Sequence, residues 1–221
     1  MELDIFLIFL TGVFAWFTAV LSGGSGSLIF LPLSFLFLPA ETMAPVTVIA
    51  MFFSNMFNTL RHLHNADPTK LKKSLAKVFV CAFLSVWLYS VTDALIYSVL
   101  LLLFYISHLA LGVRLNRGSL PSYFVTGFFG ISPLPPATAT DDKAASNILN
   151  LISLVTVISG YVFFGIINSN ILLSGVAGGI GAVSGGLIGK RFSAAFPDRV
   201  FRTLINIVLI VCVCIIVAGQ L

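Results

Sequence analysis

Charged side chains are scarce in this sequence, because Asp, Glu, Lys and Arg together make up only 9% of its 221 residues. A soluble domain carries about 25% charged residues, which keep its surface in contact with water. Hydrophobic residues account for 58% of the chain, and apolar runs long enough to cross a bilayer recur along it. The composition therefore excludes a soluble domain and predicts an all-α polytopic protein in the lipid bilayer.

Motifs that carry metal or catalytic chemistry are also missing. The three cysteines, Cys81, Cys212 and Cys214, lie inside apolar runs, and no pair has the spacing of a metal site. There is no His-Glu-x-x-His motif and no phosphate-binding loop. The Gly-Gly-Ile-Gly stretch at 178–181 lies inside an apolar run and indicates close helix packing. We therefore expect no enzyme activity, no catalytic residue, no metal and no cofactor.

The formal net charge of +4 does not indicate a nucleic-acid partner. The basic residues occur in short clusters between apolar runs, where such clusters set the orientation of membrane helices. The first residues, Met1 to Asp4, lack the basic region that opens a signal peptide, so we expect the first apolar run to be retained. We predict a multi-pass protein of the inner cell membrane.

Apolar segments alternate with short polar stretches along the whole chain. They span residues 4–22, 27–39, 43–62, 74–92, 94–113, 119–131, 144–166, 170–189 and 200–219. Most have about 20 residues, enough to cross a hydrocarbon core of about 30 Å. Segments 27–39 and 119–131 are shorter and are interrupted by Gly or Pro, which in transporters is the best sequence indication of a binding site.

The chain divides into two similar halves, which we expect to form one membrane domain from two repeats, residues 1–113 and 114–221. Identities between the halves are few, as between Thr11-Gly12 and Thr126-Gly127. The prediction of a repeat therefore depends mainly on the matching order of apolar segments in the two halves.

Basic residues predict that the two halves have opposite orientations. The basic loops at 61–77, 114–117 and 190–202 are expected in the cytoplasm. Loop 166–170 then lies outside, whereas the equivalent stretch 63–73 lies inside. We therefore predict inverted-topology repeats, each with a broken-helix hairpin followed by three transmembrane helices. The alternative is one more full helix in place of a hairpin.

A Gly/Ser run interrupts the first apolar hairpin. It consists of Ser22, Gly23, Gly24, Ser25, Gly26 and Ser27. A helix does not run cheaply through three glycines and three serines. A break here leaves backbone N–H groups at the start of the next half-helix, where the helix dipole also attracts anions. The alternative is a small-residue packing face.

Polar side chains form a stripe in each half, at spacings that put them on one helix face. The first consists of Thr47, Ser54, Asn58 and Arg61, with Asn55 beside it; the second consists of Ser146, Asn150 and Ser153, with Asn147 beside it. Together with Ser132, these residues are predicted to form an anion site near the middle of the bilayer. The alternatives are interhelical hydrogen bonding and, for Arg61, an anchor at the membrane surface.

Several stretches resemble the sulfite exporter TauE/SafE family over nearly the whole chain. They are the run Ser22 to Ser27 leading to Pro32, the turn Pro39-Ala40-Glu41 followed by Ala44 and Thr47, and the stretch 185–192 followed by Phe196-Pro197-Asp198. The chain departs from the family in its second hairpin, which is shorter and reads Gly-Phe-Phe-Gly-Ile-Ser-Pro-Leu-Pro-Pro at 127–136.

The resemblance implies secondary transport of a small sulfur-containing anion, such as sulfite, a sulfonate or sulfoacetate, without nucleotide hydrolysis. The residues themselves indicate an anion, a midplane site and alternating access, and they do not indicate sulfur. Protons as the coupling ion and a homodimer are left open. The alternative functions are an anion channel and a membrane assembly protein that transports nothing.

Overall fold

The computed structural model describes residues 2–22, 25–60, 68–111, 120–132 and 143–192, together with 207, 210 and 211. The first five ranges form eight α-helices and contain no strand. The helices are α1 (Glu2–Ser22), α2 (Gly26–Ser34), α3 (Ala40–Leu60), α4 (Pro68–Val91), α5 (Ala94–Leu111), α6 (Leu120–Phe129), α7 (Lys143–Phe163) and α8 (Ser169–Phe192). The predicted all-α polytopic fold class is confirmed.

Five of these helices are long and apolar enough to cross a membrane by length and composition. The spans are Leu3–Leu21, Ala40–Phe57, Ser74–Val91, Ala145–Phe163 and Ser169–Phe192, and Ala94–His108 in α5 is a shorter apolar helix. By contrast, α2 has 9 residues and α6 has 10. At 1.5 Å per residue each is about 15 Å long, half of a hydrocarbon core. These are the two segments whose interruption the sequence predicts; predicted segment 200–219 lies almost wholly outside the described residues.

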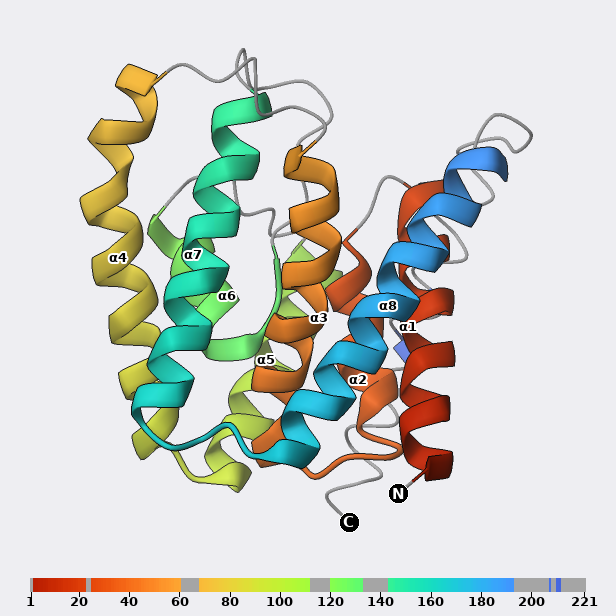
Figure 1. The fold of residues 1–221 in the computed structure, drawn as a ribbon. Coiled ribbons are helices and arrows are strands. Elements are labelled where there is room, and N and C mark those ends of the chain that lie inside the picture. Colours follow the sequence, from red (N-terminus) through yellow and green to blue (C-terminus); the bar gives the residue numbers. More distant parts are fainter. Residues whose placement is uncertain are drawn as a thin grey trace.

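The long helices form a row in the order α4, α7, α3, α8, α1, and α2, α5 and α6 lie behind it in the view of Figure 1. Packing follows this order, because α1 contacts α8, α8 contacts α3, α3 contacts α7 and α7 contacts α4. The two short helices join the row at different places: α2 packs against α1 and α3, and α6 packs against α4 and α7. Helix α3 therefore lies at the centre of the bundle.

Figure 1 also shows where the helices begin and end. The start of α1 and the α2–α3, α4–α5 and α7–α8 connections lie at one end of the bundle. The end of α3 and the starts of α4 and α7 lie at the other. Helices α3 and α7 run antiparallel, because Thr59 near the end of α3 donates a hydrogen bond to the carbonyl of Asn147 near the start of α7.

Helices α1 and α8 approach each other closely enough for their backbones to touch. A Cβ atom built on Gly12 of α1 would lie 2.5 Å from the carbonyl oxygen of Gly178 in α8, and one on Gly181 would collide with the carbonyl oxygen of Phe9. Small residues allow this approach between membrane helices, where packing replaces the hydrophobic effect as the driving force. The interpretation of Gly-Gly-Ile-Gly as a packing motif is confirmed.

Large apolar side chains cover the outward faces of the bundle. On α4, Phe79, Val80, Phe83 and Trp87 are exposed. Contiguous apolar surface of this kind is rare on soluble monomers. The outer surface of the described helices is therefore suited to lipid.

We predict that Gly185→Ala destabilises the protein, whereas Gly186→Ala does not. A Cβ at Gly185 would collide with the carbonyl of Val13 on α1, and one at Gly186 would meet nothing within 4 Å. Overpacking of this type costs about 1–3 kcal/mol. Thermal unfolding of both variants in the same detergent measures the difference. Equal melting temperatures for Gly185→Ala and the wild type would contradict the close contact.

Candidate functional site

The first break separates α1 from α2 inside the bundle. Ser25 precedes α2 as its N-cap with an extended backbone (φ −101°, ψ 125°), and its side chain makes no capping hydrogen bond. The Ser25 hydroxyl lies instead 2.8 Å from the Ser27 hydroxyl. Gly26 packs under the indole of Trp16, so closely that a Cβ would lie 2.5 Å from Cδ2. A helix start, with the positive end of its dipole, is therefore held between α1 and α3.

The second break ends α6. Its last backbone bond runs from the N–H of Gly130 to the carbonyl of Thr126, at 3.1 Å. Gly130 then adopts a φ of 69°, in the left-handed region that glycine enters without steric cost. It also lies against α3, where a Cβ would be 3.0 Å from both Cα and O of Ala44. Glycine is needed here both for the turn and for the contact.

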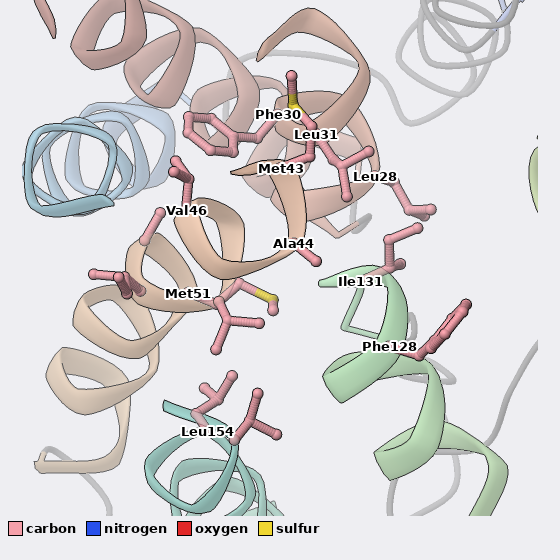
Figure 2. Packing of buried hydrophobic residues seen from close by; sticks show 14 of the residues in the cluster. Leu28, Phe30, Leu31, Met43, Ala44, Val46, Met51, Phe128, Ile131 and Leu154 are labelled. Carbon is pink, nitrogen blue, oxygen red and sulfur yellow. The ribbon is translucent and has the colours of Figure 1, made fainter. Parts of the chain in front are cut away.

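The two breaks meet at one hydrogen bond. The backbone N–H of Ser132, just after the second break, donates to the hydroxyl oxygen of Ser27 in the first turn of α2, at 3.0 Å. Both serines are buried. Figure 2 shows the surrounding apolar side chains, with Leu28 of α2, Ile131 and Ala44 of α3 labelled around the junction. Residues 105 positions apart in the sequence thus join the two interrupted segments.

A second polar contact links α3 with α7. The side-chain amide of Asn150 donates to Oδ1 of Asn55 at 2.9 Å, and the amide of Asn55 donates to the carbonyl of Met51 at 2.9 Å. Asn150 is only 5% exposed. These bonds use one N–H of each amide, and an amide has two. The pair therefore joins two long helices and still carries polar atoms beyond the contact.

Two serine hydroxyls on α7 are buried without a hydrogen-bond partner among the described residues. They belong to Ser146 and Ser153, which are seven residues apart and share a helix face. A buried hydroxyl left without a partner costs about 1–3 kcal/mol. Such groups in a native structure need an explanation, and an additional molecule bound beside them is one.

The predicted site residues fall into two polar groups along α3. The junction group contains Ser25, Gly26, Ser27 and Ser132, and the amide group contains the bonded pair Asn55 and Asn150, with Ser146, Asn147 and Ser153 about one turn from Asn150 along α7. Thr47, at the junction level, and Asn55 are eight residues apart, about 12 Å along the helix. The sequence predicted one pocket, whereas the structure brings these residues together at two depths.

The other predicted residues contribute less or cannot be placed. Ser54 is buried in α3, and the Thr47 hydroxyl donates to the carbonyl of Met43 in its own helix, so its proton is already used. Gly23, Gly24 and Arg61 lie outside the described residues, as do the side chains of Ser22 and Asn58.

The sequence interpretation missed Gly130, although a signal was present. It placed the end of the short segment at residue 131, and the turn occurs one residue earlier, at the glycine of Phe-Phe-Gly-Ile-Ser. A glycine in the left-handed conformation is a common helix end. Within the part of the chain that the structure describes, no three His, Cys, Asp or Glu residues gather to form a metal site.

We predict that Asn55 and Asn150 are energetically coupled. Asn55→Ala and Asn150→Ala should each lower the free energy of unfolding by about 1–2 kcal/mol, because each leaves the other amide without its partner. The double variant should cost less than the sum, by about 0.6 kcal/mol. Reversible unfolding in mixed micelles gives these values.

Asn170→Ala, at an exposed position in α8, is the control and should unfold like the wild type. Strict additivity of the two single variants would rule out the pairing of Asn55 with Asn150.

Comparison with protein families matches residues 8–216 to the family described as sulfite exporter TauE/SafE. No curated protein and no solved structure matches the chain. The match covers both breaks and all of the described helices except the first residues of α1.

Proposed function

The chain belongs to the sulfite exporter TauE/SafE family, as its sequence motifs predict, and we propose that it is a secondary transporter of a small sulfur-containing oxyanion. The candidate substrates are sulfite, a sulfonate and sulfoacetate, carried by alternating access across the inner cell membrane. The single observation that carries the proposal is the junction of the two interrupted segments at Ser27 and Ser132 inside the bundle.

The junction offers donors of the kind that bind an anion. A helix start presents backbone N–H groups and the positive end of the dipole, and serine hydroxyls add further donors. Ser27 also accepts a hydrogen bond from Ser132, so its proton is available for a ligand or for Ser25. A sulfur oxyanion has several acceptor oxygens that such donors can share.

Neutral donors suit transport better than a fixed positive charge would. None of the buried side chains in the described ranges is charged. An anion held by hydrogen bonds and a helix dipole alone is bound weakly enough to leave again, which transport requires. This supports a transported substrate over a tightly held ligand.

The amide group supplies a second position along the same path. Asn150, Ser146 and Ser153 lie on one face of α7, and Asn150 contacts α3 through Asn55. The two serine hydroxyls without protein partners would donate to a passing anion. The two groups of neutral donors lie at the levels of Thr47 and Asn55, which are about 12 Å apart along α3. They then act as successive binding positions.

We also propose that residues 1–113 and 114–221 are inverted repeats. Helices α3 and α7, the first long helices after each break, run antiparallel. The hairpin of α1 and α2 begins and ends at one end of the bundle, and α6 enters from the other end (Figure 1). Both placements support opposite insertion, and rocking of one half against the other would alternate access.

Uptake of radiolabelled sulfite into proteoliposomes tests the proposal. Wild-type uptake should saturate with sulfite concentration. Ser27→Ala and Asn150→Ala should each lower kcat/KM by about 10- to 100-fold, because a hydrogen bond to a charged ligand contributes about 1.5–3 kcal/mol. Ser90→Ala, at an exposed position in α4, is the matched control and should transport normally.

Flux that rises linearly without saturation would favour the channel. Wild-type rates in both Ser27→Ala and Asn150→Ala would exclude the proposed site.

Topology can be tested separately by cysteine labelling. With the three native cysteines replaced, Asn168→Cys between α7 and α8 should react in intact cells with a membrane-impermeant maleimide. Lys72→Cys in α4 should react only after the membrane is opened. Both side chains are exposed, so accessibility within the protein does not differ. Labelling of Asn168→Cys only from the cytoplasm would end the inverted-repeat proposal.

A further inference from the structure

Four of the five tyrosines donate their hydroxyl to a backbone carbonyl in a distant helix. The pairs are Tyr105 with Leu28 at 2.8 Å, Tyr161 with Gly127 at 2.6 Å, Tyr97 with Phe129 at 3.3 Å, and Tyr89 with Glu41. All four tyrosines are buried. Their acceptors lie in the interrupted helices α2 and α6 and at the start of α3, where the backbone is interrupted or a proline lies inside the helix.

The acceptor of Tyr105 is a carbonyl that a proline leaves without a donor. Pro32 lies inside α2 and has no N–H. In a regular helix that N–H would donate to the carbonyl four residues earlier, which is Leu28. The Tyr105 hydroxyl donates to this carbonyl. A side chain of α5 therefore replaces the backbone hydrogen bond that α2 lacks.

The same relation holds in α3. Pro45 lies inside this helix, and the carbonyl four residues earlier belongs to Glu41. The hydroxyl of Tyr89, from α4, donates to that carbonyl. Two prolines in two helices thus each have a tyrosine that supplies the missing donor.

The remaining two tyrosines serve the end of α6. Because the last backbone hydrogen bond of α6 runs from Gly130 to Thr126 and Gly130 then turns away, the carbonyls after Thr126 lie beyond that bond. Tyr161 of α7 donates to Gly127, and Tyr97 of α5 donates to Phe129. In the hydrocarbon core there is no bulk water to take their place.

We propose that Tyr89, Tyr97, Tyr105 and Tyr161 are positioning residues that supply missing backbone donors. Three of them hold the interrupted helices α2 and α6 in place, and Tyr89 does the same for the proline-containing start of α3. Helix α5 carries two of them, with Tyr105 bound to the first break and Tyr97 bound to the second. These two residues are about 12 Å apart along α5, so this helix fixes the spacing between the breaks. Their consequence for transport rests on the proposed function.

Removal of the hydroxyl alone tests the positioning role, because phenylalanine keeps the ring packing. Tyr123→Phe is the matched control: Tyr123 is also buried, and its hydroxyl has no partner among the described residues. Tyr105→Phe and Tyr89→Phe should each lower Tm by about 2–4 °C, and Tyr123→Phe should not lower it.

The decisive experiment restores the backbone donor. Pro32→Ala returns an N–H to the position that can donate to Leu28, so Tyr105→Phe should cost much less in that background. Pro45→Ala should rescue Tyr89→Phe in the same way. Each proline change should rescue only its own tyrosine, which general loosening of the fold would not produce.

Equal loss of Tm with and without the matching proline change would overturn the proposal. If Tyr105→Phe alone does not fold, recovery of folded protein in Pro32→Ala/Tyr105→Phe supports the proposal, and failure to recover overturns it. In proteoliposomes, Tyr105→Phe should raise the KM for sulfite, with partial return in the double variant. Rescue of Tm without any sulfite transport by the wild type would refute the proposed function and leave the positioning role intact.

Discussion

The constraint on which this structure depends is that backbone N–H and C=O groups inside a bilayer need partners within the protein. A continuous helix supplies these partners within its own backbone, whereas an interrupted helix leaves some of the groups at the break without one. Here α2 begins and α6 ends inside the bundle, and side chains of other helices complete both. The hydroxyl oxygen of Ser27 accepts a hydrogen bond from the N–H of Ser132, and the hydroxyls of buried tyrosines donate to the free carbonyls. The breaks can therefore exist only in the finished assembly of helices.

The bundle combines two kinds of helix contact. Along α1 and α8 the backbones come into contact at glycines. Between α3 and α7 the contact is through amides and beside unpartnered hydroxyls. Polar atoms in a membrane interior are costly, so they occur where they hydrogen-bond to one another or line a functional site. The first pair of helices forms the framework, and α3 with α7 forms the lining of the proposed path.

Helix positions could be predicted closely from the sequence, because the length of an apolar run decides whether it spans. Segment 43–62 became Ala40–Leu60, and both short segments were found. The bond between Ser27 and Ser132 could not be predicted, since it depends on which segments become neighbours. The separation of Thr47 and Asn55 along α3 follows from their eight-residue spacing, about 12 Å, so the sequence already contained it although the prediction joined them in one pocket. The inverted repeat and the division at residue 113 stay predictions.

The close contact between α1 and α8 has a consequence for biosynthesis. A ribosome makes α1 before α8, with the six helices α2 to α7 between them, so α1 is synthesised well before the helix that contacts it most. During that interval Gly12 lacks the α8 backbone against which it packs in the complete bundle. A chain that stops before α8 therefore lacks the helix that covers more of α1 than any other described helix does.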